Sequence, residues 1–378
     1  MLKVLDITHF YSKKSGGIKT YLLEKSKYLF KKGINHSLIV PDKEDYIKNI
    51  NNAKYYFVKS PPLPFSKYYR LLLNKAKIFE IIEKEEPDIV EVGSPYFLPS
   101  WINEKKDFFG YRTVGFFHSN IEGSLSSILK LKQLKKSSSL ISEKIIKKEY
   151  SDFDIVITPS KYIENYINKI GIENTTTVYL GVDRTTFFYR KKETTLRAKY
   201  NIPKDKIILI YVGRLTQDKD ILELADIYNN LDHNKYHLII VGSGNKKKKL
   251  FKKIKFNFTY FGYLQNKKQL AQILSLSDIY ITTSKIETFG LSVVEAQACG
   301  LPVIAYKLGS LPEVVYKKEL LVDSKDEFIK MIENASKYYI TENIRKEISI
   351  FTRNYFSWEK TFNKLLEIYN QLLINVKI

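Results

Sequence analysis

The chain has 378 residues, of which 44% are hydrophobic, a single cysteine and a formal net charge of +21. This length suits two ordinary domains, no apolar run reaches the roughly 20 residues of a membrane-spanning helix, and Cys299 alone excludes an intrachain disulfide. The first residues enter a strand pattern without a signal-peptide profile, so we expect a cytoplasmic protein. The charge favours an anionic partner such as nucleic acid, an acidic membrane surface or an acidic polymer, although the Lys, Ile and Asn bias of an AT-rich genome could supply part of it.

Residues 2–7 predict the first strand, and the pair Gly16-Gly17 stands at the turn into an amphipathic helix. A glycine pair at such a turn lets the backbone come close to a phosphate or a sugar. A plain turn is the alternative interpretation.

Three segments of the chain concentrate positive charge. Residues 66–79 mix lysines with tyrosines and leucines, which is typical of a helix lying on an anionic bilayer. Residues 121–150 predict a basic, Ser-rich helical segment, and residues 246–255 carry the densest run of lysines. Helices that hold their lysines in water are the alternative for the first two segments. For residues 246–255 a solvated helix is the main expectation, and a second contact with an anion is the alternative.

His118 follows a predicted strand over residues 112–117. A side chain just beyond the carboxyl end of a parallel strand faces the crevice where ligands bind in open α/β sheets. A histidine that only caps the strand is the alternative.

The apolar strand over residues 207–212 leads into Gly213-Arg214 and, five residues later, Lys219. Two cations at the turn from a strand to a helix can stabilise the charge of a diphosphate leaving group. Taken singly, each is an ordinary surface base.

The most informative stretch is residues 278–305, in which two buried strands flank a helix that Gly290 opens and Gly300 closes. This pattern places Glu287 in the loop after the first strand and Glu295 early in the helix, so both carboxylates can face one crevice. Carboxylates accept hydrogen bonds from sugar hydroxyls, and the amides at the start of the helix can bind phosphate. A nucleotide sugar carries both groups, whereas the alternative is a pair of ordinary surface glutamates.

The spacing Glu287-Thr-Phe-Gly-x4-Glu295-Ala-x-Ala-x-Gly-x-Pro-Val resembles the signature of glycosyltransferase family 4, whose members are retaining nucleotide-sugar transferases. The resemblance extends to Gly-Arg-Leu-x3-Lys at residues 213–219 and to the positions of Gly16-Gly17 and His118. It implies an α/β fold of the GT-B type with two facing Rossmann-like domains. The expected parts are an acceptor-binding domain over 1–185, a donor-binding domain over 186–356 and a C-terminal helix over 357–378 that returns to the first domain.

The resemblance also implies a role for each matching residue. Glu295 would bind the ribose, Glu287 the hydroxyls of the donor sugar, Arg214 and Lys219 the diphosphate, and His118 would position the sugar. The other expected donor-binding residues are Gly16, Gly17, Tyr263, Thr288, Phe289, Gly290 and Leu291. The sequence departs from the family pattern at Ser310, which takes the place of a glycine, and at Tyr179-Leu180, which replaces Pro-Asn.

The expected reaction keeps the configuration of the anomeric carbon and uses a UDP- or GDP-sugar, without another cofactor. No Asp-x-Asp cluster lies near these elements, so no divalent metal is required, and arginine and lysine can supply the positive charge. Residues 91–99 and 117–119 are similar to lipid-directed mannosyl- and sulfoquinovosyl-transferases. We therefore expect a lipid or glycolipid acceptor and a peripheral position on the inner face of the cell membrane, with a soluble or polysaccharide acceptor as the alternative.

Two other classes of protein fit less well. A nicotinamide dehydrogenase would show Gly-x-Gly-x-x-Gly after a strand with an acidic residue about 20 positions later, and no strand here leads into that pattern. A nucleic-acid-binding protein would explain the charge, but it does not predict paired glutamates beside an Arg-Lys pair. We expect no nucleic-acid partner.

Overall fold

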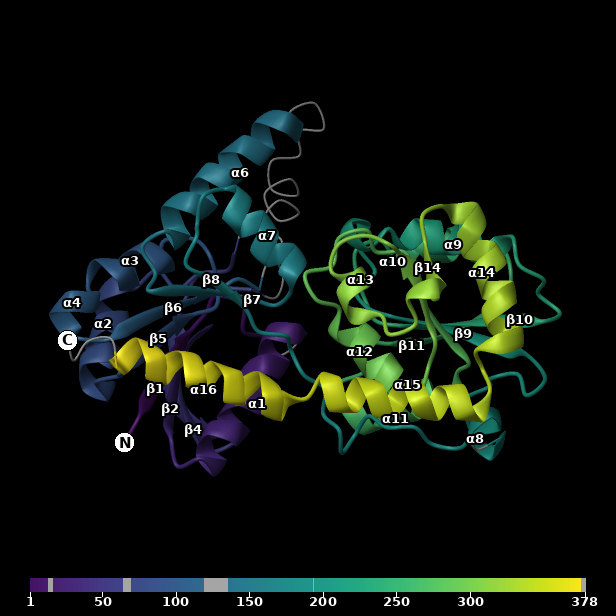
Figure 1. The fold of residues 1–378 in the computed structure, drawn as a ribbon, viewed down its shortest axis with the longest axis horizontal. Coiled ribbons are helices and arrows are strands. Elements are labelled where there is room, and N and C mark those ends of the chain that lie inside the picture. The colour runs from purple at the N-terminus through teal and green to yellow at the C-terminus, as the bar shows by residue number, and fades with distance from the viewer. Residues whose placement is uncertain (13–15, 64–68, 119–134, 193, 375–378) are drawn as a thin grey trace. The chain divides into compact units, whose positions relative to one another are not determined.

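The computed structural model describes residues 1–378 except 13–15, 64–68, 119–134, 193 and 375–378, and only the backbone of 135–141 and 194. The chain forms two α/β units (Figure 1). The first unit comprises Met1–Leu180 together with Trp358–Ile378, and the second comprises Gly181–Ser357.

The first unit contains an eight-stranded sheet with the strand order β3-β4-β2-β1-β5-β6-β7-β8. All neighbouring strands are parallel except β3, which runs antiparallel to β4. The strands are β1 (Lys3–Ile7), β2 (Asn35–Asp42), β3 (Tyr46–Ile50), β4 (Ala53–Lys59), β5 (Ile89–Val92), β6 (Arg112–Phe116), β7 (Ile155–Thr158) and β8 (Thr175–Thr177). Helices cover both faces of the central strands, so these strands are almost fully buried, and β1 and β5 are apolar except at Lys3, Asp6 and Glu91.

Two groups of helices cover this sheet. The helices are α1 (Gly17–Lys31), α2 (Lys75–Glu85), α3 (Leu98–Glu104), α4 (Lys106–Phe109), α6 (Lys135–Tyr150), α7 (Lys161–Lys169) and α16 (Trp358–Ile374). Side chains of α2, α3, α6 and α7 share one hydrophobic core with the sheet. The C-terminal helix α16 lies beside α1, at the other end of the sequence (Figure 1).

The helix predicted over residues 66–79 is wrong in its first part, since α2 begins only at Lys75. Leu71 N donates to Pro61 O at 2.9 Å, and Leu63 N donates to Tyr69 O at 2.9 Å, so this strand-like stretch pairs with the chain just before it. Leu72 is fully buried. These non-local contacts outweigh the amphipathic pattern over 69–74, whereas residues 66–68 lie outside the described part. Of the predicted helical segment 121–150, the described part from residue 135 is the helix α6.

The second unit contains a six-stranded sheet with the order β11-β10-β9-β12-β13-β14, in which every neighbouring pair is parallel. The strands are β9 (Ile207–Val212), β10 (Tyr236–Val241), β11 (Phe258–Gly262), β12 (Ile279–Thr282), β13 (Val303–Tyr306) and β14 (Leu321–Val322). The chain goes from β9 outward to β10 and β11 and then returns to place β12 on the other side of β9. The strand order therefore reverses between β9 and β12, which is where open α/β sheets bind ligands.

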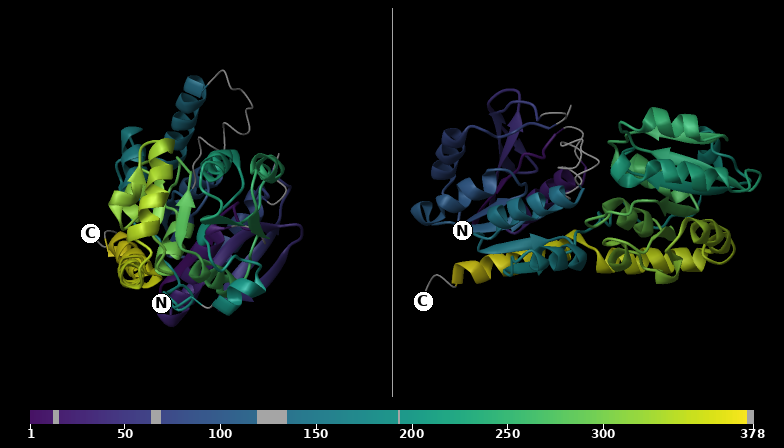
Figure 2. Two further views of the ribbon diagram at one scale, coloured as in Figure 1. Left: turned by 90° about the vertical axis from the view of Figure 1, so that its right-hand side faces the viewer. Right: turned by 90° about the horizontal axis from the view of Figure 1, so that it is seen from above.

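Helices lie on both faces of the second sheet (Figure 2). They are α8 (Thr194–Lys199), η1 (Gln217–Lys219), α9 (Ile221–Asn229), α10 (Lys247–Lys253), α11 (Lys267–Leu276), α12 (Leu291–Ala298), α13 (Leu311–Val314), η2 (Lys318–Leu320), α14 (Lys325–Tyr338) and α15 (Glu342–Tyr355). One core packs α9, α10 and α14 against the strands, and α12 contacts α11 and α15. The predicted fold class, α/β with two Rossmann-like parallel sheets, is confirmed.

The described helices are all too short or too polar to cross a bilayer.

Candidate functional site

The reversal of strand order in the second unit brings Lys219 and Glu287 together. Lys219 ends the short η1 helix after β9, and Glu287 lies in the loop after β12. Lys219 Nζ is 2.6 Å from Glu287 Oε1, and the two side chains are 14% and 15% exposed. The sequence predicted both residues as site residues, and the structure places them in direct contact.

The loops that carry this pair are tied to one another. Thr283 Oγ1 contacts the carbonyl oxygens of Lys219 at 3.2 Å and of Asp220 at 3.1 Å, which joins the end of β12 to η1. Ser310 N donates to Glu287 O at 3.2 Å, so the loop after β13 supports the Glu287 backbone. The pair is therefore held by backbone contacts and not by the side chains alone.

Ser310 occupies the position where the family pattern has a glycine. Its φ of −81° and ψ of −6° are open to any residue, and its Oγ donates to Phe289 O at 3.0 Å. Gly309 before it has φ of +62°, and a Cβ there would lie 3.1 Å from the backbone N and O of Glu287. Serine is therefore compatible with the loop at position 310, because the position that requires glycine is Gly309.

The helix α12 begins at Leu291, directly after Gly290, whose φ of +96° lies in the left-handed region that favours glycine. Glu295 lies in the second turn and is half-buried. Burial raises the pKa of Glu295 to about 7; the nearby Lys267 ammonium lowers this pKa and the Asp183 carboxylate raises it. Glu295 is consequently balanced between its neutral and ionised forms near neutral pH.

Tyr280, at the middle of β12, links the two glutamates. Its hydroxyl donates to Val212 O at 3.0 Å and lies 2.9 Å from Ser292 Oγ on α12. Burial, and then the charges of Glu287 and Glu295, raise the pKa of Tyr280 above its ordinary value. Both carboxylates therefore act on one buried phenol, as expected if they lie at the same end of the sheet.

Arg214 is at this end of the sheet but pairs elsewhere. Its Nη2 lies 2.7 Å from Asp218 Oδ2, and its side chain is 66% exposed. Tyr211 OH donates to Arg214 O at 2.9 Å and fixes the backbone. The guanidinium therefore pairs with Asp218, four residues later. Burial raises the pKa of the Tyr211 hydroxyl, and the charges of both Glu287 and Arg214 also act on this pKa.

The remaining predicted donor-binding residues differ in exposure. Tyr263 follows β11 and is 40% exposed, while Thr288 is half-buried. Phe289 is buried against Phe356, with ring centroids 5.6 Å apart, so its side chain belongs to the core.

In the first unit, His118 follows β6 as predicted. Its ring stacks on Phe116 with centroids 3.9 Å apart and meets the edge of Tyr21 at 5.0 Å. Burial lowers the pKa of His118 to about 3, so the imidazole is neutral at physiological pH. Gly16 and Gly17 are exposed at the start of α1.

The sequence reasoning missed a buried charged cluster in the first unit. Lys25 Nζ lies 2.9 Å from Asp6 Oδ1 and 3.0 Å from Glu91 Oε2. Tyr21 OH donates to Glu91 Oε1 at 2.8 Å, and Tyr369 OH of α16 donates to the other Glu91 oxygen. Burial raises the pKa of Glu91 to about 7. A lysine on the apolar face of α1 was the available signal for this cluster.

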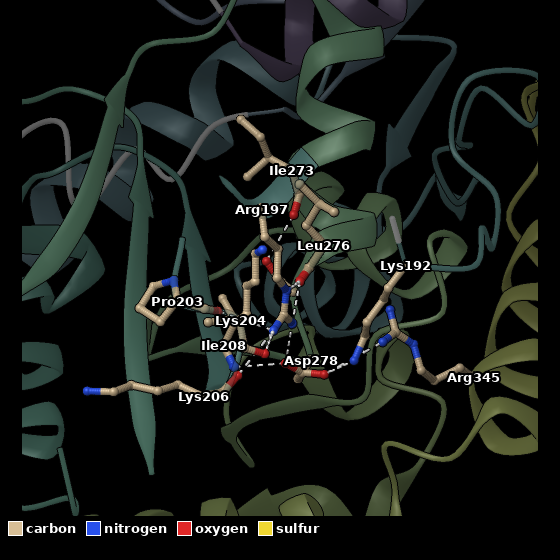
Figure 3. A network of polar contacts seen from close by, with 11 residues as sticks. Lys192, Arg197, Pro203, Lys204, Lys206, Ile208, Ile273, Leu276, Asp278 and Arg345 are labelled. Carbon is tan, nitrogen blue, oxygen red and sulfur yellow. Dashed lines mark hydrogen bonds and ion pairs between the residues drawn. The ribbon is translucent and has the colours of Figure 1, made fainter. Parts of the chain in front are cut away.

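A second buried cluster surrounds Asp278 at the start of β12 (Figure 3). Asp278 Oδ2 accepts from Ile208 N at 2.8 Å and from Arg197 Nη2 at 2.9 Å, and Oδ1 pairs with Lys192. Arg345 Nη1 is 3.9 Å from the same carboxylate. The cluster lies at the amino end of the strand, so it is distinct from the Lys219–Glu287 pair.

Within the described part of the chain, no three His, Cys, Asp or Glu side chains are grouped so that they could hold a metal ion.

Comparison with family models agrees with the division into two units. Residues 15–186 match the model described as Glycosyltransferase Family 4, and residues 192–354 match the model described as Glycosyl transferases group 1.

Several curated proteins are similar in sequence. A GDP-mannose-dependent alpha-(1-6)-phosphatidylinositol dimannoside mannosyltransferase of Mycobacterium tuberculosis is 25% identical over 83% of this chain and 82% of its own. A sulfoquinovosyl transferase of Arabidopsis thaliana is 30% identical over 43% of this chain and 32% of its own. An N-acetyl-alpha-D-glucosaminyl L-malate synthase of Bacillus anthracis is 30% identical over 37% of each chain.

Solved structures share the fold. Sucrose-phosphate synthase from Thermosynechococcus elongatus superimposes with a TM-score of 0.82 at 19% identity, covering 99% of this chain and 100% of that one. The HepE protein of Anabaena in complex with UDP-glucose gives a TM-score of 0.74 at 17% identity, covering 98% and 100%.

Proposed function

The chain belongs to glycosyltransferase family 4 and is a nucleotide-sugar glycosyltransferase, and we propose that it glycosylates a membrane lipid or glycolipid with retention at the anomeric carbon. The main support for a donor site here is the contact between Lys219 and Glu287, at the point where the strand order reverses. A cation for phosphate and an acceptor for hydroxyls lie side by side there, with Glu295 at the same strand end.

The ion pair supports a simple sequence of events when the donor binds. The diphosphate carries more charge than one carboxylate and competes for Lys219. Glu287 is then released to accept hydrogen bonds from the hydroxyls of the donor sugar. Glu295, when ionised, accepts hydrogen bonds from the ribose.

The proposed chemistry needs no protein nucleophile. The bond from the anomeric carbon to the phosphate oxygen breaks, and a bond to the acceptor oxygen forms on the same face. The acceptor proton passes to the departing diphosphate. Lys219 and the exposed Arg214 would stabilise the negative charge that develops on the diphosphate, so we propose that no metal ion or other cofactor is required.

We assign His118 to the positioning of the donor sugar. The depressed pKa keeps its ring neutral, so it can hydrogen-bond to a hydroxyl but adds no positive charge. The exposed backbone at Gly16 and Gly17 offers amides to the diphosphate.

The lipid acceptor is supported by relatives and by charge. The mycobacterial relative, which matches most of this chain, is named for a phosphatidylinositol dimannoside acceptor, and the Arabidopsis relative for sulfoquinovosyl transfer. A net charge of +21 favours contact with anionic lipid. We propose that the enzyme works peripherally on the cytoplasmic face of the cell membrane.

A soluble acceptor is the second candidate, since other relatives are named for L-malate or for sucrose phosphate synthesis.

The first experiment screens UDP- and GDP-sugars by thermal stabilisation of the protein. The stabilising donor is then incubated with lipid extract or soluble sugars, and the anomeric configuration of the product is determined by NMR. A product with retained configuration on a lipid, together with tighter binding to anionic than to neutral vesicles at 0.15 M salt, is the expected result. Equal binding to both kinds of vesicle, or inverted product, would refute the corresponding part of the proposal.

A further inference from the structure

The second unit contains a cavity of about 350 Å³ that the donor-binding residues do not line. It lies between the segment that begins this unit and the helix α11. Its polar lining combines cations with hydroxyl groups: Arg190, Lys191, Lys268, Thr185, Thr186 and Ser275. Leu276, at the end of α11, supplies an apolar surface. Lys219, Glu287 and Glu295 take no part in this lining.

Arg190 is held in place by the segment that carries it. Its guanidinium carbon lies 3.6 Å from the centre of the Phe188 ring, and its Nη2 donates to Thr186 O at 2.9 Å. A weaker contact of 3.5 Å joins Nη1 to Phe188 O. These contacts occupy two of the five N–H groups of an arginine. A half-buried guanidinium fixed on an aromatic ring is pre-organised to bind an anion with its other donors.

The cations at the cavity make no direct ion pair with a described residue, although the Asp183 carboxylate accepts a hydrogen bond from Thr185 Oγ1 of the lining at 2.7 Å. Within the described part of the chain, no carboxylate lies within ion-pair distance of Arg190, Lys191 or Lys268. Lys191 exerts only a minor effect on the pKa of Glu342. Elsewhere in the same unit, lysines of similar exposure do find acidic partners, as Lys253 does with Asp226 and Lys285 with Glu223.

The neighbouring Asp278 cluster adds positive charge rather than removing it. The single carboxylate of Asp278 faces the cations Lys192, Arg197 and Arg345 (Figure 3). Arg345 is 2% exposed, and its Nε and Nη2 lack a hydrogen-bond partner. Lys192 directly follows the cavity residues Arg190 and Lys191 in the chain. Three cations that share one carboxylate are only partly compensated, so an external anion beside this cluster would lower the electrostatic free energy of the unit.

We propose that this cavity binds a phosphate or diphosphate group of a small molecule at a site distinct from the donor site. Guanidinium and ammonium groups are donors that phosphate oxygens prefer, whereas the hydroxyls of Thr185 and Ser275 already donate to Asp183 Oδ1 and Ala271 O. The volume falls within the range of about 300 to 1,000 Å³ of small-molecule sites, so the ligand carries an organic part beyond its phosphate. Binding would join the segment 185–191 to α11 through the shared anion.

Isothermal titration calorimetry with inorganic pyrophosphate at 0.15 M salt tests this site. Lys219→Ala removes the donor-site cation, and pyrophosphate binding at the second site is expected to persist in that variant. Lys268→Glu changes an exposed residue and should leave folding intact, while weakening this remaining binding by roughly tenfold or more. Combining it with Arg190→Gln should abolish the binding. The control pair Lys330→Gln and Lys337→Gln, on exposed positions of α14, should leave it unchanged.

The outcomes separate this proposal from the proposed function. Loss of all pyrophosphate binding in Lys219→Ala would overturn the second site. So would an affinity for pyrophosphate that is the same in Lys219→Ala with and without the added Lys268→Glu substitution. Absence of any stabilising nucleotide sugar would count against the proposed function while leaving the second site standing. Binding to vesicles of phosphatidic acid identifies the source of the phosphate. Vesicle binding that is lost in Lys268→Glu identifies a lipid headgroup. Pyrophosphate binding without vesicle binding identifies a free metabolite.

Discussion

Lys219 Nζ lies 2.6 Å from Glu287 Oε1, across the two strand ends where the sheet of the second unit reverses its order. The two residues are expected to hold different parts of one donor, the phosphates and the sugar. Their contact means that each compensates the charge of the other.

Removing either member of this pair is predicted to reduce activity much more than stability. Lys219→Ala and Glu287→Ala should each lower kcat/KM by about 100-fold or more, since groups aimed at developing charge contribute on that scale. The free energy of unfolding should change by about 1 kcal/mol, because a pair near the surface adds little to stability. The exposed pair Glu342 and Lys346 on α15 provides the matched alanine controls. Activity within twofold of the unmodified enzyme in either site variant would contradict the assignment.

Donor binding is predicted to depend on pH through Glu295. Its pKa of about 7 means that the carboxylate ionises between roughly pH 6 and 8, and only the ionised form accepts two hydrogen bonds from a ribose. The affinity for the nucleotide should therefore rise over this interval. In Glu295→Gln the affinity should be lower and independent of pH, which calorimetry at several pH values can establish.

The raised pKa of Glu295 also predicts that the stability of the protein falls as the pH rises, whereas its affinity for the nucleotide increases. The folded chain binds the Glu295 proton more tightly than the unfolded chain does, so ionisation favours unfolding as the pH rises from about 4.5 to 7. Glu295→Gln should therefore be more stable than the unmodified protein at pH 8, by up to about 3 kcal/mol, with the difference vanishing near pH 4.5. Urea unfolding of both proteins at pH 4.5 and pH 8 measures this difference in the free energy of unfolding. A difference that does not vary with pH would refute the raised pKa of Glu295.

His118 is predicted to act as a neutral imidazole. Burial holds the pKa of His118 near 3, so the ring does not change its charge near pH 6.5. The pH profiles of activity for the unmodified enzyme and for a His118 variant should therefore have the same shape near pH 6.5. His118→Gln keeps a neutral hydrogen-bonding side chain and should retain more activity than His118→Ala. An inflection near pH 6.5 that is lost in both variants would contradict the neutral role.

The C-terminal helix is predicted to depend on the buried cluster around Glu91. Tyr369→Phe removes the hydroxyl that α16 donates to Glu91 and should destabilise the first unit by about 1 to 3 kcal/mol, because a buried carboxylate oxygen then keeps only Lys25 as its partner. Lys25→Met should cost more, about 3 to 5 kcal/mol, since it leaves Asp6 and Glu91 without their counter-charge. Tyr338→Phe, at a position 63% exposed, is the control. Chemical denaturation that gives equal midpoints for Tyr369→Phe and its control would argue against the anchoring role.

The parts of the fold that follow local rules were predictable from the sequence. The strands β12 and β13 and the helix α12 between them are marked by apolar runs and by Gly290 and Gly300, whose positive φ angles match their predicted roles. The order of chain segments around Lys219 and Glu287 follows from the reversal of strand order that is typical of such sheets. The sequence could therefore predict that these two residues lie at the same end of the sheet, but it could not predict their direct ion pair.

The features that the sequence did not reveal depend on contacts between distant residues. The stretch before α2 is not helical because it pairs with Pro61 and Leu63 and buries Leu72, none of which an amphipathic pattern registers. Asp6, Lys25 and Glu91 are far apart in the sequence and meet only once β1, α1 and β5 are assembled. The choice of Asp218 as the partner of Arg214 is a local contact, only four residues apart, that depends on the turn conformation of η1.

The most direct test of the central claim is the affinity of the stabilising nucleotide sugar for the unmodified protein and for Lys219→Ala, Glu287→Ala and Glu295→Ala, measured by calorimetry at pH 8. The account predicts that each substitution weakens binding by roughly tenfold or more while the thermal midpoint without ligand stays close to that of the unmodified protein. Binding of equal strength in all four proteins would show that the nucleotide sugar is held elsewhere, and would contradict the account.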